Sequence, residues 1–214
     1  MNIAKIIRFA DYFLSVATAE KLPENTNDIK LLLANIEKLN TYHARIKYCE
    51  KNLKHLSSGS SRVVYKLNDK SVLKLAKNEK GLAQNKAECQ TKIKSKYINL
   101  PTNHANNYFW VEAPLLKKIT EAQFKKITGV SFKDFDESVG YGLKNVSGST
   151  DKEKPEKFEE IEKTKIYKEI KEISNKLKLM PGDIGRLSSW CIKNDIPVLI
   201  DTGLTRKIFD DFYE

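Results

Sequence analysis

The sequence predicts an α+β protein in which helices precede and follow a small antiparallel sheet. Apolar residues recur at helical spacing through the first 54 residues, and two short strand-like segments joined by a turn occupy residues 62–67 and 71–76. A charged segment at residues 151–178 carries a single apolar stripe, which is typical of a helix that lies on a core. With 214 residues, of which 40% are hydrophobic, the chain is long enough to bury a sizeable core.

Two amphipathic helices are expected within residues 1–54. The first carries its apolar residues on one face: Ile3, Ile6, Ile7, Ala10, Phe13, Leu14 and Ala17. After a break at residues 22–27 the same period returns in Ile29, Leu32, Leu33, Ile36 and Leu39. It continues less regularly to Leu53, as a helical hairpin or a long packed helix. These helices either cover the sheet as a structural layer or form a partner-binding surface.

The middle of the chain predicts a β-hairpin, a helix and a further strand. Small residues at 57–61 form a loop that leads into strands at residues 62–67 and 71–76. Helical spacing then covers about residues 79–96, and residues 108–114 predict a short strand that enters a connector. The expected order is therefore strand, strand, helix, strand.

The last third predicts a loop, a charged helix and a strand that ends in an acidic residue. Glycine, proline and serine are frequent in residues 139–155, which we interpret as a mobile loop. The apolar stripe of the charged helix consists of Ile166, Ile170, Ile173 and Leu177. Residues 197–200 are apolar and form the strand before Asp201.

Charge and hydropathy narrow the class of protein. The formal net charge is +10, mostly from lysine. A high lysine content can reflect an AT-rich genome as easily as selection for binding polyanions, so nucleic-acid binding stays an open alternative. No apolar run of about eighteen residues occurs, and the first residues are too polar for a secretory signal, so we expect a cytoplasmic protein without a membrane span. Cys49, Cys89 and Cys191 lack metal or disulfide spacing and are expected to be reduced.

Lys74 lies in the middle of an otherwise apolar strand, where an ammonium group without a partner would be costly. Glu88, on the following helix, is a suitable carboxylate partner. A lysine held in this way would point at phosphate groups, and backbone amides of the small-residue turn at 57–61 can approach the same oxygens. The alternative is that Lys74 lies on the outer face of an edge strand.

Two aspartates eighteen residues apart, Asp183 and Asp201, are the strongest chemical signal. Asp201 follows the apolar strand in an Asp-Thr-Gly sequence, where a carboxylate is unfavourable unless it binds something; Mg²⁺ bridging phosphates would remove that penalty. Asp183 lies in a Pro-Gly-Asp turn, from which it could orient an acceptor hydroxyl for phosphoryl transfer. Each aspartate taken alone is also consistent with an ordinary turn or N-cap residue.

On these residues, the segment 56–203 resembles the protein-kinase-like superfamily, including aminoglycoside-phosphotransferase-type enzymes, and more closely the small kinase-like proteins of bacteriophages. The matching pieces are Ser57 to Ser61, Val72-Leu73-Lys74, Glu88, the hinge Val111-Glu112-Ala113, Gly182-Asp183 and Asp201-Thr202-Gly203. The resemblance implies a two-lobed kinase-like fold with an N-terminal helical extension. An antiparallel five-stranded N-lobe and a reduced helical C-lobe would hold ATP and Mg²⁺ in the cleft between them.

The resemblance also implies roles for individual residues. Lys74 and Glu88 would orient the phosphates, Asp183 would act as catalytic base, and Asp201 would bind the metal. Contacts with the nucleotide are implied for Ser58, Gly59, Ser60, Ser61 and Glu112. The phosphate loop keeps one glycine of the family's three, and Ser188 stands where the family has a metal-binding asparagine. A hydroxyl is a poorer ligand for Mg²⁺, so Ser188 supports a second metal less well.

We expect a helical extension at residues 1–54, an N-lobe at residues 55–114 and a C-lobe at residues 115–214. Only eleven residues follow Gly203, so the C-lobe should be reduced and should lack the usual peptide-substrate site. The chain would then bind nucleotide and transfer phosphate to itself, to a protein or to a small acceptor. The alternative is an inactive pseudokinase: a phage-encoded inhibitor or decoy that meets a host protein through its N-terminal helices, in the host cytoplasm.

Overall fold

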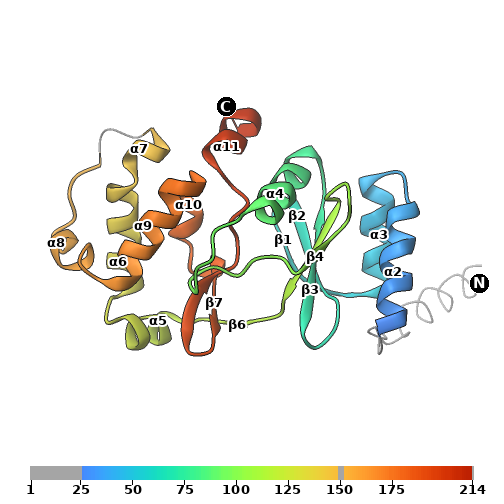
Figure 1. Cartoon of the computed structure of the whole chain (residues 1–214), viewed down its shortest axis with the longest axis horizontal. Coiled ribbons are helices and arrows are strands. Elements are labelled where there is room, and N and C mark those ends of the chain that lie inside the picture. Colours follow the sequence, from blue (N-terminus) through green and yellow to red (C-terminus); the bar gives the residue numbers. More distant parts are fainter. Residues whose placement is uncertain (1–25, 149–151, 214) are drawn as a thin grey trace, which may run out of the picture.

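The computed structural model describes residues 26–148 and 152–213, so the helix expected over residues 3–17 lies outside the described residues. A pair of helices stands at one end of the elongated molecule, a five-stranded sheet lies beside it, and most of the remaining helices gather at the other end (Figure 1). No helix within the described ranges is long and apolar enough to cross a membrane.

The two helices at the N-terminal end are α2 (Thr26–Lys38) and α3 (Tyr42–Asn52). Thr41 caps α3 by accepting a hydrogen bond from the backbone N–H of Ala44. The buried residues of the pair are Leu32, Leu33, Ile36, Arg45 and Cys49. Of the two arrangements expected here, the helical hairpin is the one present, and it gives way to a strand at Lys54.

An antiparallel sheet of five strands, in the order β1-β2-β3-β5-β4, packs against this hairpin. Its strands are β1 (Lys54–Ser58), β2 (Arg62–Lys66), β3 (Ser71–Ala76), β4 (Asn103–His104) and β5 (Trp110–Pro114). The sequence predicts β2, β3 and β5 correctly, but it misses β1 and β4. Every residue of β1 and β4 is exposed, so no apolar alternation marks these two edge strands.

The two faces of the sheet differ in chemistry because side chains alternate along a strand. Leu73 of β3 lies on the face that packs against α2 and α3, and Lys74 lies on the other face. In the β2–β3 register, Arg62 shares the face of Lys74. Helix α4 (Glu79–Gln90) covers this second face and is shorter than the helix expected over residues 79–96.

The other half of the molecule holds helices and a three-stranded antiparallel sheet. The helices are α5 (Glu121–Thr128), α6 (Phe132–Gly142), α7 (Lys144–Ser147), α8 (Phe158–Ile161), α9 (Lys165–Leu177), α10 (Pro181–Ile184) and α11 (Arg206–Tyr213), with a 3₁₀ turn η1 (Leu187–Ser189). The strands are β6 (Lys117–Lys118), β7 (Trp190–Lys193) and β8 (Ile196–Leu199). Strand β8 is the one expected before Asp201, whereas its partner β7 is not predicted from the sequence.

The charged helix expected over residues 151–178 is α9, preceded by the short α8. Its predicted stripe faces the core: Ile166, Ile170 and Ile173 are buried, and Leu177 packs at the edge of the same cluster. The loop expected over residues 139–155 is wrong in its first part, because α6 continues through Gly142. A Cβ at Gly142, the last residue of α6, would lie 1.7 Å from the hydroxyl oxygen of Tyr167, so this glycine allows close packing between α6 and α9.

Buried apolar side chains form two clusters. One joins α2, α3 and the five-stranded sheet and includes Trp110. The other joins α5, α6 and α9 to β7 and β8 and includes Trp190, which meets Phe124 and Phe135 edge to face. Both tryptophans are core residues, as expected, and all three cysteines are free. The domain boundaries given above stay a prediction.

Candidate active site

Lys74 on β3 and Glu88 on α4 form the centre of the site. Nζ of Lys74 lies 2.8 Å from Oε2 of Glu88 and donates a second hydrogen bond to the carbonyl oxygen of Ile200 at 2.7 Å. The exposed fractions are 7% for Lys74 and 1% for Glu88. This is the pairing that a lysine in an apolar strand requires. The alternative, an outward-facing lysine on an edge strand, is wrong because β3 lies in the middle of the sheet.

Arg62, at the start of β2, connects this pair to Asp201. Its Nη1 lies 2.8 Å from Oε1 of Glu88, and its Nη2 lies 2.5 Å from Oδ1 of Asp201. Nη1 also donates to Oδ1 of Asn85 at 3.3 Å, and only 7% of Arg62 is exposed. Arg62 is not among the site residues expected from the sequence. The signal that could have found it is a charged residue at the first position of an apolar strand, directly after a small-residue turn.

Helix α4 turns a polar stripe toward the sheet, formed by Gly81, Gln84, Asn85 and Glu88. Residues at this spacing share one helix face. Gln84 accepts a hydrogen bond from the hydroxyl of Ser61 at 2.7 Å, and Asn85 donates to the carbonyl of Tyr108 at 2.9 Å. A Cβ at Gly81 would lie 2.1 Å from the carbonyl oxygen of Ser61. The stripe therefore holds α4 close to β2 and fixes the direction of Glu88.

The residues expected to contact phosphate lie at the turn between β1 and β2: Ser58, Gly59, Ser60 and Ser61. Gly59 closes the turn by donating its N–H to the carbonyl of Arg62 at 2.9 Å. Lys77 holds the turn through two hydrogen bonds. Its Nζ donates to the carbonyl of Gly59 at 2.9 Å, and its backbone N–H donates to the carbonyl of Ser61 at 2.8 Å. The turn is thus attached to the start of α4.

Asp201 follows β8, and its Oδ1 accepts hydrogen bonds from Arg62 and, at 3.4 Å, from the backbone N–H of Gly203. Burial alone would raise the pKa of Asp201. The positive charges of Arg62 and Lys74 outweigh that effect and hold the pKa well below its usual range. Asp201 is therefore ionised at neutral pH.

Asp183 lies on α10 near Asp201, and its pKa moves the other way. Burial raises the pKa of Asp183 to about 6, and the negative charge of Asp201 adds to the shift. Arg186, whose Nη1 lies 3.3 Å from Oδ1 of Asp183, acts in the opposite direction. Neighbouring carboxylates with pKa values moved apart can divide the work, one staying charged while the other exchanges a proton.

The turn that carries Asp183 is held in place from two directions. The indole Nε1 of Trp190 donates to the carbonyl of Ile184 at 2.7 Å, which ties α10 to the aromatic core. The N–H of Met180 donates to the carbonyl of Leu204 at 3.0 Å, which ties the turn to the segment after Asp201. The segments that carry the two aspartates are therefore hydrogen-bonded to each other.

Six of the expected site residues are not part of this cluster: the turn residues 58–61, which are hydrogen-bonded to Lys77, Asn78 and Gln84, together with Glu112 and Ser188. Glu112 on β5 is paired with Leu73, so its side chain lies on the sheet face opposite to Lys74. Its carbonyl oxygen accepts the N–H of Thr102 at 2.8 Å within the sheet. Ser188 lies on η1 and is exposed. The residues that the structure does bring together are Lys74, Glu88, Asp183 and Asp201.

The residues present fit a nucleotide phosphate and a divalent cation under one condition. Lys74 and Arg62 offer positive charge to phosphate oxygens, and Asp183 and Asp201 offer carboxylate oxygens of the kind that Mg²⁺ prefers. Within residues 26–148 and 152–213, however, no cluster of three acidic, histidine or cysteine side chains forms a ready metal site. A metal would therefore need oxygen ligands from the nucleotide and the release of Asp201 by Arg62.

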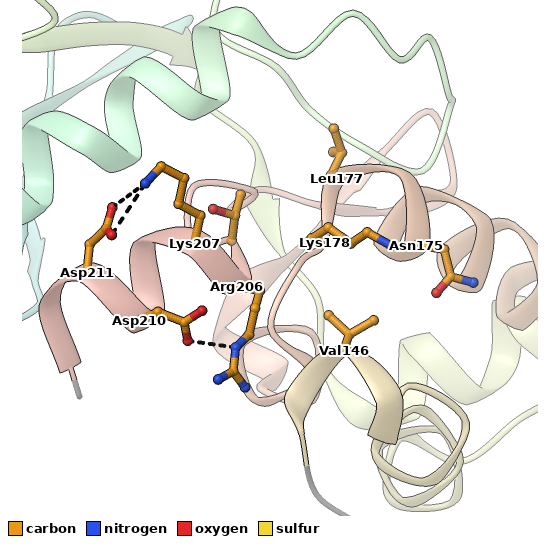
Figure 2. A pocket seen from close by; sticks show the side chains of 9 residues that line it. Val146, Asn175, Leu177, Lys178, Arg206, Lys207, Asp210 and Asp211 are labelled. Atoms are coloured by element: carbon orange, nitrogen blue, oxygen red, sulfur yellow. Dashed lines mark hydrogen bonds and ion pairs between the residues drawn. The ribbon is translucent and has the colours of Figure 1, made fainter.

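A separate open pocket of about 860 Å³ lies between the C-terminal end of α9 and helix α11 (Figure 2). Two ion pairs of α11 lie along it: Nε of Arg206 is 2.6 Å from Oδ1 of Asp210, and Nζ of Lys207 is 3.0 Å from Oδ2 of Asp211. Its lining includes the segment directly after Leu204, but neither of the two site aspartates lines it.

No protein-family model matches the chain, and no curated protein matches it. Among solved structures, the ADP-bound aminoglycoside phosphotransferase APH(2'')-Ib is similar at 15% identity and a TM-score of 0.34, covering 86% of this chain and 74% of that one. The streptomycin–ATP–APH(2'')-IIa ternary complex is similar at 17% identity and a TM-score of 0.34, covering 85% and 73%. The gentamicin–APH(2'')-IIa complex is similar at 17% identity and a TM-score of 0.32, covering 85% of this chain and 71% of that one. Values this low leave the function to be argued from the site itself.

Proposed function

We propose that the chain binds ATP together with Mg²⁺ and transfers the terminal phosphoryl group to a hydroxyl acceptor, as a kinase-like phosphotransferase. One observation supports this most: a buried lysine–glutamate pair lies beside two aspartates whose pKa values are shifted in opposite directions. A carboxylate that is paired only for structural reasons has a lowered pKa. The pKa of Asp183 is raised, so the ionised form of this residue is less stable in the folded chain than in the unfolded chain, and its burial opposes folding. Such groups are concentrated at functional sites.

Each residue has a separate task in this proposal. Lys74, oriented by Glu88, donates hydrogen bonds to phosphate oxygens and neutralises their charge. Asp201 presents an ionised oxygen to the cation. Asp183, which is mostly ionised above pH 6, accepts the proton of the acceptor hydroxyl at a carboxylate oxygen. When bound, ATP and Mg²⁺ supply the phosphoryl group and the charge neutralisation that phosphoryl transfer requires.

We assign the two sides of the site to residues 55–114 and 115–214, with residues 1–54 as a helical extension. Support comes from the two apolar clusters: one contains buried residues of the five-stranded sheet, and the other contains most of the buried apolar residues of 115–214 together with Tyr97 and Ile98. Arg62 belongs to the first lobe and Asp201 to the second, and their ion pair joins them. The acceptor is a small molecule, another protein or the chain itself, and roles for Glu112 and Ser188 remain predictions.

Binding of ATP with Mg²⁺, measured by isothermal titration calorimetry, tests the nucleotide site. We expect Lys74→Ala and Asp201→Ala each to weaken binding by about tenfold or more, because each removes a charged partner. The matched control is Lys66→Ala: Lys66 lies on the neighbouring strand and pairs with the exposed Asp69, so its loss should leave the affinity unchanged. Unchanged affinity in both site variants would reject the site.

Phosphate transfer is tested separately with radiolabelled ATP, with the chain itself and water as the acceptors present. Asp183→Asn should retain ATP binding and lose transfer by about a hundredfold or more, because the amide cannot accept the proton. Transfer at the unaltered rate in Asp183→Asn would show that another group is the base.

A function without catalysis is favoured by a different observation: the guanidinium of Arg62 already stands against Asp201, 2.5 Å away. If this ion pair never opens, the chain is a kinase-like scaffold that binds another protein. A thermal-shift measurement with millimolar ATP and Mg²⁺ distinguishes the two functions. A ligand that binds only the folded state must raise the melting temperature of the protein. An unchanged melting temperature would therefore support the scaffold function.

A further inference from the structure

The cation at Asp201 in this structure is a side chain of the protein. Arg62 places Nη2 2.5 Å from Oδ1 of Asp201 and Nη1 2.8 Å from Oε1 of Glu88. It projects from the same sheet face as Lys74, and only 7% of it is exposed. The guanidinium therefore lies in a buried position between the two carboxylates, where few other partners are available to it.

The charges of this network are balanced without any ligand. Arg62 and Lys74 are positive, and Glu88 and Asp201 are negative, so each carboxylate has a cation beside it. A free divalent cation that binds Oδ1 of Asp201 would displace the guanidinium from its position there and would meet its positive charge, and a buried unpaired charge is strongly unfavourable. A nucleotide changes this balance because its phosphates offer the planar guanidinium a two-point acceptor.

We propose that Arg62 is an internal counter-ion that keeps free divalent cations away from Asp201 and releases this carboxylate only when nucleotide phosphates take over the guanidinium. Arg62 is then a positioning residue of the metal site and a phosphate-binding residue of the nucleotide site. The second role rests on the proposed function. The first does not, because it concerns the metal alone.

The test is binding of Mn²⁺ without nucleotide, followed by electron paramagnetic resonance of the free ion. The wild-type chain should show no saturable site at Asp201, and Arg62→Gln should bind Mn²⁺ at least about tenfold more tightly, because the positive charge beside Oδ1 of Asp201 is removed. Arg62→Lys keeps a positive charge and should behave like the wild type. Arg62→Gln combined with Asp201→Asn should lose the gained site.

Two results would overturn the proposal. One is wild-type binding of free Mn²⁺ that disappears in Asp201→Asn, which needs no Arg62 variant and so holds even where Arg62→Gln fails to fold. The other is a folded Arg62→Gln chain, checked by circular dichroism, that gains no Mn²⁺ site.

A second titration, with Mn²⁺ and a non-hydrolysable ATP analogue together, separates this proposal from the proposed function. If the wild-type chain binds no metal even with the analogue, while Arg62→Gln binds Mn²⁺ without it, nucleotide binding is refuted and the role of Arg62 is supported. If the wild-type chain binds Mn²⁺ together with the analogue, while Arg62→Gln gains no Mn²⁺ site, nucleotide binding is supported and the role of Arg62 is refuted.

Discussion

Asp183 illustrates how a single residue can oppose folding at neutral pH. Its pKa is raised to about 6, whereas an aspartate in an unfolded chain titrates near 3.9. Between these values the folded state holds more protons than the unfolded state. The contribution of Asp183 to the free energy of unfolding therefore falls as the pH rises from about 4 to about 6. Asp201 has the opposite sign: with a lowered pKa, its contribution is present above about pH 4 and is lost as the pH falls.

Asp183→Asn should therefore stabilise the protein at neutral pH while it removes the proposed base. The upper limit of the gain is about 3 kcal/mol, from a shift of about two pKa units. The gain should shrink as the pH falls from about 6 to about 4, because Asp183 is then protonated in the folded state and its charge is progressively lost in the unfolded state as well. Urea unfolding of both chains across this range measures it. Asp195→Asn, in the exposed turn between β7 and β8, is the control and should change little.

At the residue scale, the sequence predicted the charged residues that are isolated in apolar surroundings. Lys74 lies between leucines on a buried strand, so its need for Glu88 is apparent from the strand alone. Arg62 follows two serines at a strand end, where an exposed arginine is equally natural, and its burial depends on the position of α4. The pairing of Arg62 with Asp201 crosses 139 positions of the chain, which no local pattern records.

At the element scale, strand β1 and the last turn of α6 are missed because their residues look like those of a loop. Strand β1 is exposed along its whole length and holds its place through pairing with β2, a property of the neighbour and not of its own sequence. The last turn of α6 contains two glycines, which usually end helices, yet Gly142 is required there because Tyr167 packs directly against it. In both cases tertiary contacts outweigh local preference.

Gly81 provides the matching prediction for α4. A methyl group there would lie 2.1 Å from the backbone carbonyl of Ser61, which cannot move away as a flexible side chain could. Gly81→Ala should cost about 2 kcal/mol or more in the free energy of unfolding and should weaken ATP binding, because it displaces Glu88. Gly182→Ala is the control: no atom lies within 4 Å of the added methyl group, so stability should be nearly unchanged. Equal stability of the two variants, measured in urea, would contradict the close packing of α4.

At the scale of the whole molecule, the contacts that join the two apolar cores include an ion pair and a hydrogen bond at the site. Arg62 pairs with Asp201, and Lys74 donates to the carbonyl of Ile200, so two cations of the first half depend on groups of the second. Removing the partner of a buried charge costs about 3–5 kcal/mol. That cost is comparable with the total stability of a typical domain, about 5–15 kcal/mol, so neither core should unfold while the other stays intact.

The two tryptophans make this cooperativity measurable, since the chain has only two and each core contains one. Trp110→Phe leaves Trp190 as the reporter of the helical core, and Trp190→Phe leaves Trp110 as the reporter of the sheet core. Each change lowers stability by itself, so the comparison is made within each variant, between tryptophan fluorescence and far-ultraviolet circular dichroism. We expect the two signals to coincide in urea for both variants, because a single transition unfolds both cores. Fluorescence that changes before the circular dichroism in either variant would show that the contacts across the site do not couple the cores, and the ion pair of Arg62 with Asp201 would then contribute little to holding the two halves together.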